Sequence, residues 1–83
     1  MQRTARTASQ IGAIVQRERR ARGLSQAQLG ARIGRRQATI SKLEQGEPAT
    51  QLSTLFDVLS ALNLDLVIDE RTKTSKEDIE RLF

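Results

Sequence analysis

The sequence predicts an all-α domain of four helices, followed by one short β-strand. Apolar residues recur at intervals of three and four in four segments between residues 9 and 62, and a glycine follows three of these segments. From residue 64 onward the apolar residues alternate instead. Intervals of three and four are typical of amphipathic helices, and alternation is typical of a half-buried strand. A chain of 83 residues has room for one small domain and a tail.

The first helix is predicted over residues 9–22. Ile11, Ile14 and Val15 lie at positions i, i+3 and i+4, so that they share one face. Gly23 follows directly, and glycine is the residue that most often ends a helix.

The second and third helices are short and lie close together in the sequence. Ser25 followed by Gln28 predicts a capping box that starts the second helix, which ends at Gly34. The third helix is predicted over about residues 36–45, with Gly46 ending it. The apolar residues expected to pack these two helices together are Leu29, Ile33, Ile40 and Leu43.

The fourth helix is predicted to begin at Thr50, a residue type that caps helix starts well. A continuous apolar stripe follows at helical spacing, and we expect it to lie in the core. The stripe consists of Leu52, Leu55, Phe56, Leu59 and Leu62.

Residues 64–70 predict a β-strand, because Leu64, Leu66 and Ile68 alternate with more polar positions. A single strand leaves its backbone hydrogen-bonding groups without partners. The simplest partner is the same strand of a second copy, so we predict a homodimer in which this strand pairs across the two subunits. Two alternatives stay open: the fourth helix continues, or the strand folds back on its own subunit.

Both ends of the chain are predicted to be flexible. Residues 1–8 form a basic N-terminal arm and residues 71–83 form a polar C-terminal tail, so the folded domain spans residues 9–70. The tail ends with three apolar residues at helical spacing, Ile79, Leu82 and Phe83. Both a frayed end and a segment that folds on a protein partner fit this pattern.

The charges are distributed unevenly. Residues 1–50 contain ten Lys and Arg against three Asp and Glu, whereas residues 51–83 contain four against seven. A basic half of this kind favours a polyanionic partner, because Lys and Arg release condensed counterions from phosphates. The alternative is a solvated basic face.

The residue types leave little room for enzyme chemistry. The chain has no cysteine and no histidine, and its acidic residues are not spaced as a metal cluster, so we expect no catalytic activity, no metal and no cofactor. Neither a signal-peptide core nor a run of about 18 apolar residues is present, so we expect a cytoplasmic protein that does not cross a membrane.

The segment "LSQAQLGARIGRRQATISKLEQG" resembles the helix-turn-helix of the Xre/Cro and lambdoid phage repressor family, and the resemblance covers residues 9–62 in helix order. Gly30 lies inside the second helix at a cost of about 1 kcal/mol, which a close approach of the third helix would explain. Arg35 departs from the family, since many members have an apolar residue there. Within the family, "GRRQATIS" with the following strand and apolar end is similar to the HipB-like antitoxin subgroup.

The resemblance implies that the third helix enters the major groove of DNA. There Gln37 can bond adenine, Ala38 can touch a thymine methyl group, and Arg36 or Lys42 can reach guanine. The expected base-reading residues are Arg36, Gln37, Ala38, Ser41 and Lys42. The expected phosphate contacts are Ser25, Gln26, Arg35 and Thr39. Each of these side chains alone could also be an ordinary solvated residue.

Two charged residues are expected inside the domain instead. Arg19 extends the apolar face of the first helix, and Glu44 lies beside the apolar positions of the third. Buried charges must be paired, so we predict an ion pair between them, and the phage repressor fold has a pair at the matching positions. Arg17, Arg20 and Arg22 are either general phosphate contacts or a solvated face.

The resulting hypothesis is a dimeric repressor that acts at the bacterial nucleoid and binds a palindromic operator of double-stranded DNA. The HipB-like subgroup implies an antitoxin that represses its own operon and neutralises a HipA-like Ser/Thr kinase toxin. The alternative is a stand-alone phage or chromosomal repressor without a toxin. RNA binding is disfavoured because Phe56 is expected in the core and no aromatic platform remains for unpaired bases.

Overall fold

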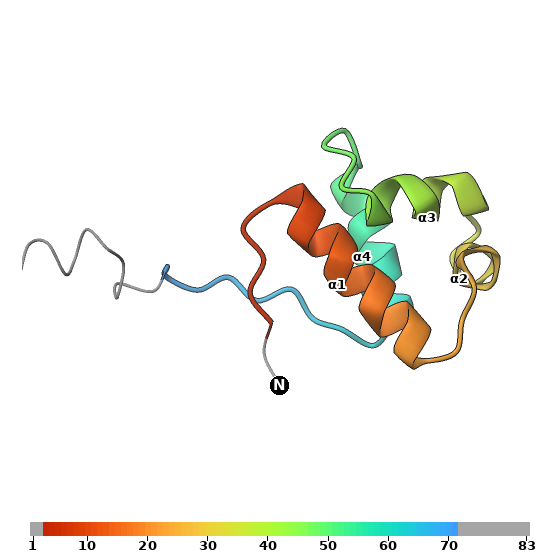
Figure 1. Ribbon diagram of the computed structural model, residues 1–83, viewed down its shortest axis with the longest axis horizontal. Coiled ribbons are helices and arrows are strands. Elements are labelled where there is room, and N and C mark those ends of the chain that lie inside the picture. The colour runs from red at the N-terminus through yellow and green to blue at the C-terminus, as the bar shows by residue number, and fades with distance from the viewer. Residues whose placement is uncertain (1–2, 72–83) are drawn as a thin grey trace, which may run out of the picture.

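A computed structural model describes residues 3–71 of the protein and contains four α-helices in this part of the chain (Figure 1). They are α1 (Ala8–Ala21), α2 (Gln26–Arg32), α3 (Gln37–Glu44) and α4 (Leu52–Ala61). The prediction of an all-α domain with four helices is therefore confirmed.

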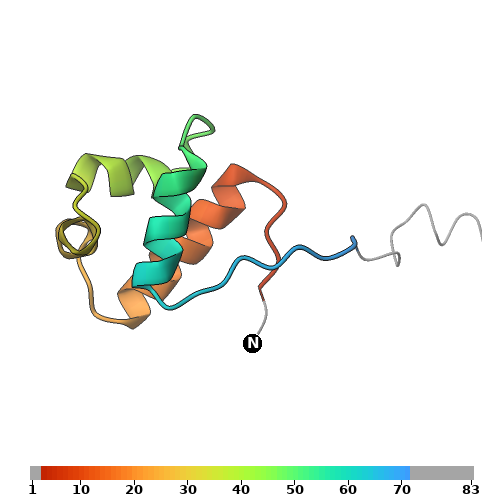
Figure 2. The same ribbon diagram turned by 180° about the vertical axis from the view of Figure 1, so that it is seen from behind.

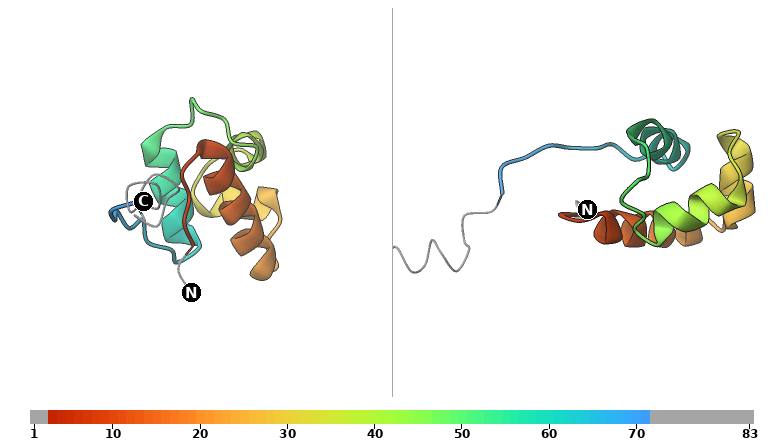
Figure 3. Two further views of the ribbon diagram at one scale, coloured as in Figure 1. Left: turned by 60° about the vertical axis from the view of Figure 1, so that its left-hand side comes forward. Right: turned by 90° about the horizontal axis from the view of Figure 1, so that it is seen from above.

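Helix α3 packs against both α1 and α2. In Figure 1 α2 is seen end-on while α3 lies across the view, so these two helices cross steeply. Seen from above, α1 and α4 form the two sides of the domain (Figure 3). One hydrophobic core joins the four helices, and its buried members are Val15, Leu29, Ile40, Leu43, Leu55, Val58, Leu59 and Leu62.

All four helices end in the same way, with one residue at positive φ directly after the last turn. These residues are Gly23, Gly34, Gly46 and Asn63. Two backbone hydrogen bonds close each helix end. At α4 the backbone N–H of Asn63 donates to the carbonyl oxygen of Ser60, and that of Leu64 donates to the carbonyl oxygen of Leu59. Gly34 matters most for the site, because its φ of +66° turns the chain from α2 into α3.

Two glycines allow close contact between backbones. A Cβ atom on Gly30 would lie 2.7 Å from the carbonyl oxygen of Arg35, so the chain entering α3 passes directly over α2. This explains the glycine inside α2 as expected. A Cβ atom on Gly12 would lie 2.5 Å from the carbonyl oxygen of Glu44, which places the end of α3 against α1.

Replacement of Gly12 by valine is expected to destabilise the domain by about 1–3 kcal/mol, since α1 and α3 would have to separate. Urea denaturation measures the change in the free energy of unfolding. The matched control is Ala13→Val on the exposed side of the same helix, where we expect a change within about 0.5 kcal/mol. Equal effects of the two substitutions would show that the helices do not touch at Gly12.

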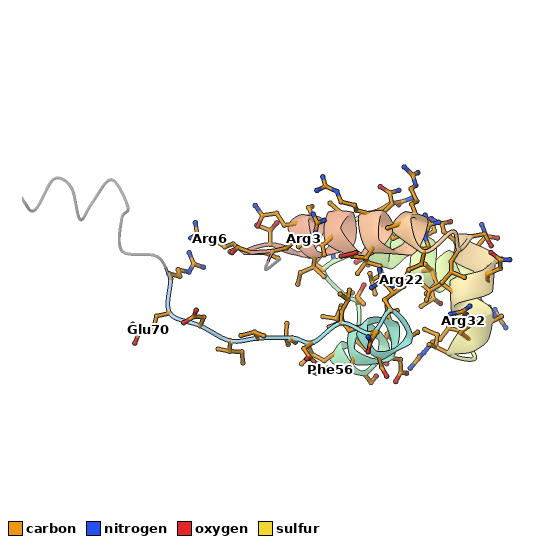
Figure 4. The ribbon with its side chains drawn as sticks, turned by 90° about the horizontal axis from the view of Figure 1, so that it is seen from below. Arg3, Arg6, Arg22, Arg32, Phe56 and Glu70 are labelled. Carbon is orange, nitrogen blue, oxygen red and sulfur yellow. The ribbon has the colours of Figure 1, made fainter. Side chains whose placement is uncertain are left out.

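Two predictions about α4 are wrong. The helix is capped by Gln51 and not by Thr50, and no side chain caps its first turn. Leu52 and Phe56 do not join the core: they are 67% and 49% exposed. The buried face of α4 is centred on Val58 instead. Figure 4 shows Phe56 on the outer side of the helix. The spacing of the apolar residues predicts a buried face of α4 that is too wide, because the three other helices cover only part of this helix.

Residues 64–71 are extended and leave the body of the domain on the side of the N-terminal arm (Figure 2). Leu64 packs against the core, whereas Leu66 and Ile68 are exposed. No hydrogen-bonded strand occurs within residues 3–71, so the predicted strand has no partner in its own described chain. The predicted apolar end of the tail, with Ile79, Leu82 and Phe83, lies outside the described residues.

Candidate nucleic-acid interface

Helix α3 has one buried face and one exposed face. Ile40, Leu43 and Glu44 are buried. The predicted base-reading residues lie on the rest of the helix or at its start: Arg36, Gln37, Ala38 and Lys42 are exposed, and Ser41 is half-buried. The structure thus brings the five candidates together on the surface of one short helix, with Gln37 as its first residue.

A hydrogen-bonded chain links the interior to this surface. The buried Arg19 donates to both carboxylate oxygens of Glu44, from Nε at 2.6 Å and from the second guanidinium nitrogen at 3.0 Å. Gln26, the first residue of α2, donates from Nε2 to Oε1 of Glu44 at 3.1 Å. Gln37 in turn donates from Nε2 to Oε1 of Gln26 at 3.4 Å. The structure therefore contains the ion pair expected from the sequence and extends it to two glutamines of the surface.

The Arg19–Glu44 ion pair is well satisfied for a buried pair. Arg19 and Glu44 are only 6% and 8% exposed, and Arg19 also donates to the carbonyl oxygen of Leu24 at 2.7 Å. Its hydrogen bonds to Glu44 raise the pKa of Arg19 further above its ordinary value, against the opposing effect of burial. The pair ties α1 to the end of α3 and fixes the carboxylate that Gln26 binds.

The predicted phosphate contacts lie in different settings. Ser25 is exposed and forms the expected capping box of α2 with Gln28. Gln26 and Thr39 are half-buried at the edge of the α2–α3 surface. Arg35 instead donates to Asp57 of α4 at 3.2 Å. At this position, where many members of the family have an apolar residue, the chain thus has an ion pair between the turn and α4.

Several basic side chains on the surface have no ion-pair partner within the part of the chain that the structure describes. Arg36 and Lys42 form no ion pair with any residue of the range 3–71, and the same is true of Arg17, Arg20 and Arg32. Glu18, in contrast, binds Arg3 of the N-terminal arm at 3.7 Å and Arg22 at 3.1 Å. Figure 4 shows Arg32 at the α2 end of the domain, far from Arg3 and Arg6. Arg3 therefore ties the arm to α1.

The described part of the chain contains neither a candidate metal site nor a membrane-spanning helix. No group of acidic, cysteine or histidine side chains there could hold a metal ion. No helix within residues 3–71 is long and apolar enough to cross a membrane.

Two short helices that cross steeply through a glycine turn, with a polar exposed face on the second, define a helix-turn-helix domain. A helix-turn-helix family model matches residues 15–68, and the protein belongs to this family. It is a relative of Antitoxin HipB from Escherichia coli strain K12, with 32% identity over 73 residues that cover 88% of this chain and 83% of that protein. The family comprises regulators and not enzymes.

Solved structures of HipB share the fold. A structure titled "HipB-O4 20mer complex" has a TM-score of 0.80 and 28% identity, and the match covers 86% of this chain and 100% of that one. A structure titled "Structure of HipA-HipB-O2-O3 complex" has a TM-score of 0.79, with the same identity and coverage.

Proposed function

We propose that this protein is a dimeric transcriptional repressor that binds a palindromic operator and serves as the antitoxin of a HipA-like Ser/Thr kinase. The observation that supports DNA binding most strongly is the exposed polar start of α3, held in place by Gln26 and Glu44. The HipB structures with O4 and with HipA favour both parts of the proposal. Such a repressor would act in the bacterial cytoplasm, on the nucleoid.

On DNA, the start of α3 would lie in the major groove and α2 would cross the backbone. Gln37 has the amide needed for adenine, and Arg36 and Lys42 have exposed, positively charged side chains for guanine. Ala38 would touch a thymine methyl group, and Ser41 would bond either kind of base. The proposed phosphate contacts remain Ser25, Gln26, Thr39 and Arg35, although Arg35 must leave or share Asp57 to reach DNA.

Selection from a library of randomised duplexes tests DNA binding. The expected result is an inverted repeat whose half-sites lie about one helical turn apart, because a two-fold symmetric dimer presents its two α3 helices at that spacing. Recovery of duplexes without a shared motif would contradict the proposed repressor.

Dimerisation is supported by the apolar side chains that the described chain leaves uncovered. Ile68 is 92% exposed and Val67 is 64% exposed, in a segment whose backbone has no strand partner within residues 3–71. A groove lined by Ile11, Leu55 and Leu66 separates this segment from the helices. Pairing of residues 64–70 with the same segment of a second copy would satisfy the backbone and cover these side chains.

Ile68→Asp is expected to weaken the dimer. Each buried isoleucine contributes about 1.5–3 kcal/mol, so loss of two per dimer should raise the dimer dissociation constant at least about 100-fold. Sedimentation equilibrium measures this constant. Ala13→Asp adds the same charge on the exposed face of α1 and should leave the constant unchanged. An equally stable Ile68→Asp dimer would place the interface elsewhere.

The acidic half of the chain and its apolar end are proposed to bind the kinase. Deletion of residues 79–83 should remove Ile79, Leu82 and Phe83 and weaken binding to a HipA-like kinase, while operator affinity stays the same. Calorimetric titration of the purified kinase with the full and shortened chains measures the difference. Unchanged kinase affinity would remove the tail from the interface, and no kinase binding by the full chain would favour a stand-alone repressor.

A further inference from the structure

We propose that Asp57 of α4 competes with the DNA phosphates for Arg35 and thereby limits the affinity of the protein for DNA. Asp57 is a positioning residue in this account, since it acts through Arg35 and touches no DNA itself. The inference rests on the proposed function as a DNA-binding repressor. It concerns the affinity for every DNA sequence rather than the choice of base.

The exposed charges of the helix-turn-helix are basic. Residues 25–46, which span α2, the turn and α3, contain one acidic residue, Glu44, and four basic residues, Arg32, Arg35, Arg36 and Lys42. Glu44 is buried and is neutralised by Arg19, so it does not lower the positive charge of the surface. Of the four basic residues, Arg35 alone forms an ion pair within residues 3–71, and its partner is Asp57. Helix α4 thus supplies a carboxylate to a basic surface.

The ion pair between Arg35 and Asp57 is of a kind that another anion can replace. Nη2 of Arg35 donates to Oδ2 of Asp57 at 3.2 Å, and this is their one hydrogen bond. The two side chains are 32% and 50% exposed. The pair of Arg19 and Glu44 is joined by two hydrogen bonds in the core instead. Exposed ion pairs have little net stability, because water and salt compete with them. A phosphate can therefore displace the Asp57 carboxylate.

The geometry favours exchange over sharing of Arg35. The backbone N–H of Arg35 donates to the carbonyl oxygen of Gly30 at 2.8 Å, and Asp57 precedes the fully buried Val58 of α4. Both backbones are thus held in place, and the long side chain of Arg35 is the part that can turn. A phosphate at Arg35 while Asp57 still holds it would put two anions beside one guanidinium, and the anions repel each other. Loss of the ion pair therefore reduces the free energy gained from the phosphate.

Asp57→Asn tests the competition, because it keeps the shape of the side chain and removes its charge. An exposed ion pair contributes up to about 1 kcal/mol, and a dimer on DNA breaks two of them. We therefore expect the variant to bind both the selected operator and random DNA about 2- to 30-fold more tightly. Fluorescence anisotropy at one fixed salt concentration measures these affinities. The melting temperature should not rise, since the substitution only removes an attraction. A purely structural ion pair would give no gain in affinity.

The same substitution in the Arg35→Ala background separates competition for Arg35 from general repulsion of DNA. Without Arg35 there is nothing to compete for, so Asp57→Asn should then change both affinities by less than about twofold. Glu47→Gln is the matched control for charge. It removes one exposed carboxylate that accepts a hydrogen bond from the backbone N–H of Ala49. Screening by salt should keep its effect on DNA affinity below about twofold.

Unchanged or weaker DNA binding by Asp57→Asn would overturn the inference. A gain of the same size in the Arg35→Ala background would also overturn it, because Asp57 would then act by repelling DNA and not through Arg35. Absence of DNA binding by the unmodified protein would instead contradict the proposed function itself.

Discussion

Replacement of Glu44 by alanine is expected to lower the free energy of unfolding by about 3–5 kcal/mol. The substitution leaves the Arg19 guanidinium in a site that is 6% exposed, with only the Leu24 carbonyl oxygen as a partner. A buried charge without its counterion retains the cost of leaving water and loses the compensating attraction. For a domain of this size the melting temperature should fall by roughly 12 °C or more. Thermal unfolding followed by circular dichroism measures the shift.

Two further variants separate pairing from the mere loss of a carboxylate. Glu70→Ala removes an exposed acid from the extended segment and should change the free energy of unfolding by less than about 0.5 kcal/mol. Arg19→Met with Glu44→Leu removes both charges and should recover most of the stability lost in Glu44→Ala. A melting temperature of Glu44→Ala equal to that of the unmodified protein would show that the ion pair does not stabilise the fold.

Replacement of Gln37 by alanine should reduce affinity for the selected operator much more than affinity for random DNA. One bidentate contact to adenine discriminates by about 1–3 kcal/mol, and a dimer makes it twice, so the expected loss is about 2–6 kcal/mol on the operator. Fluorescence anisotropy with both duplexes measures the two affinities. Helix α3 should stay folded, because Gln37 is exposed and contributes nothing to the core.

Arg35→Ala is the comparison for this prediction. As a phosphate contact, Arg35 would strengthen binding to every sequence, so its removal should weaken both affinities alike. The salt slope, which is the slope of the logarithm of the binding constant against the logarithm of the salt concentration, should become smaller by about one per protomer. Equal losses on both duplexes for Gln37→Ala would place Gln37 among the phosphate contacts. If Arg35→Ala left the salt slope unchanged, Arg35 would serve only its ion pair with Asp57.

The sequence predicts the local features of this fold well, because they depend on neighbouring residues. The capping box at Ser25, the turn at Gly34 and the order of the helices follow from short-range chemistry and are present in the structure. The buried ion pair of Arg19 and Glu44 could also be inferred, since two charges on apolar faces must meet a partner.

Features that depend on the packing of distant segments could not be predicted in this way. Phe56 shares the helical spacing of the core residues, yet the elements of residues 3–71 leave it 49% exposed. Asp57 binds Arg35 across 22 residues of sequence, and no spacing rule links them. Gly12 gave no signal beyond being a glycine within a helix, although it sets how closely α1 and α3 approach.

The measurement that tests the central proposal most directly is the affinity of the unmodified protein for its selected operator and for a shuffled duplex of the same composition, at one fixed salt concentration. A repressor that reads bases from the surface of α3 should bind the operator at least about 1,000-fold more tightly. Similar affinities for the two duplexes would show that the basic surface binds DNA only through its charge, and would contradict the account.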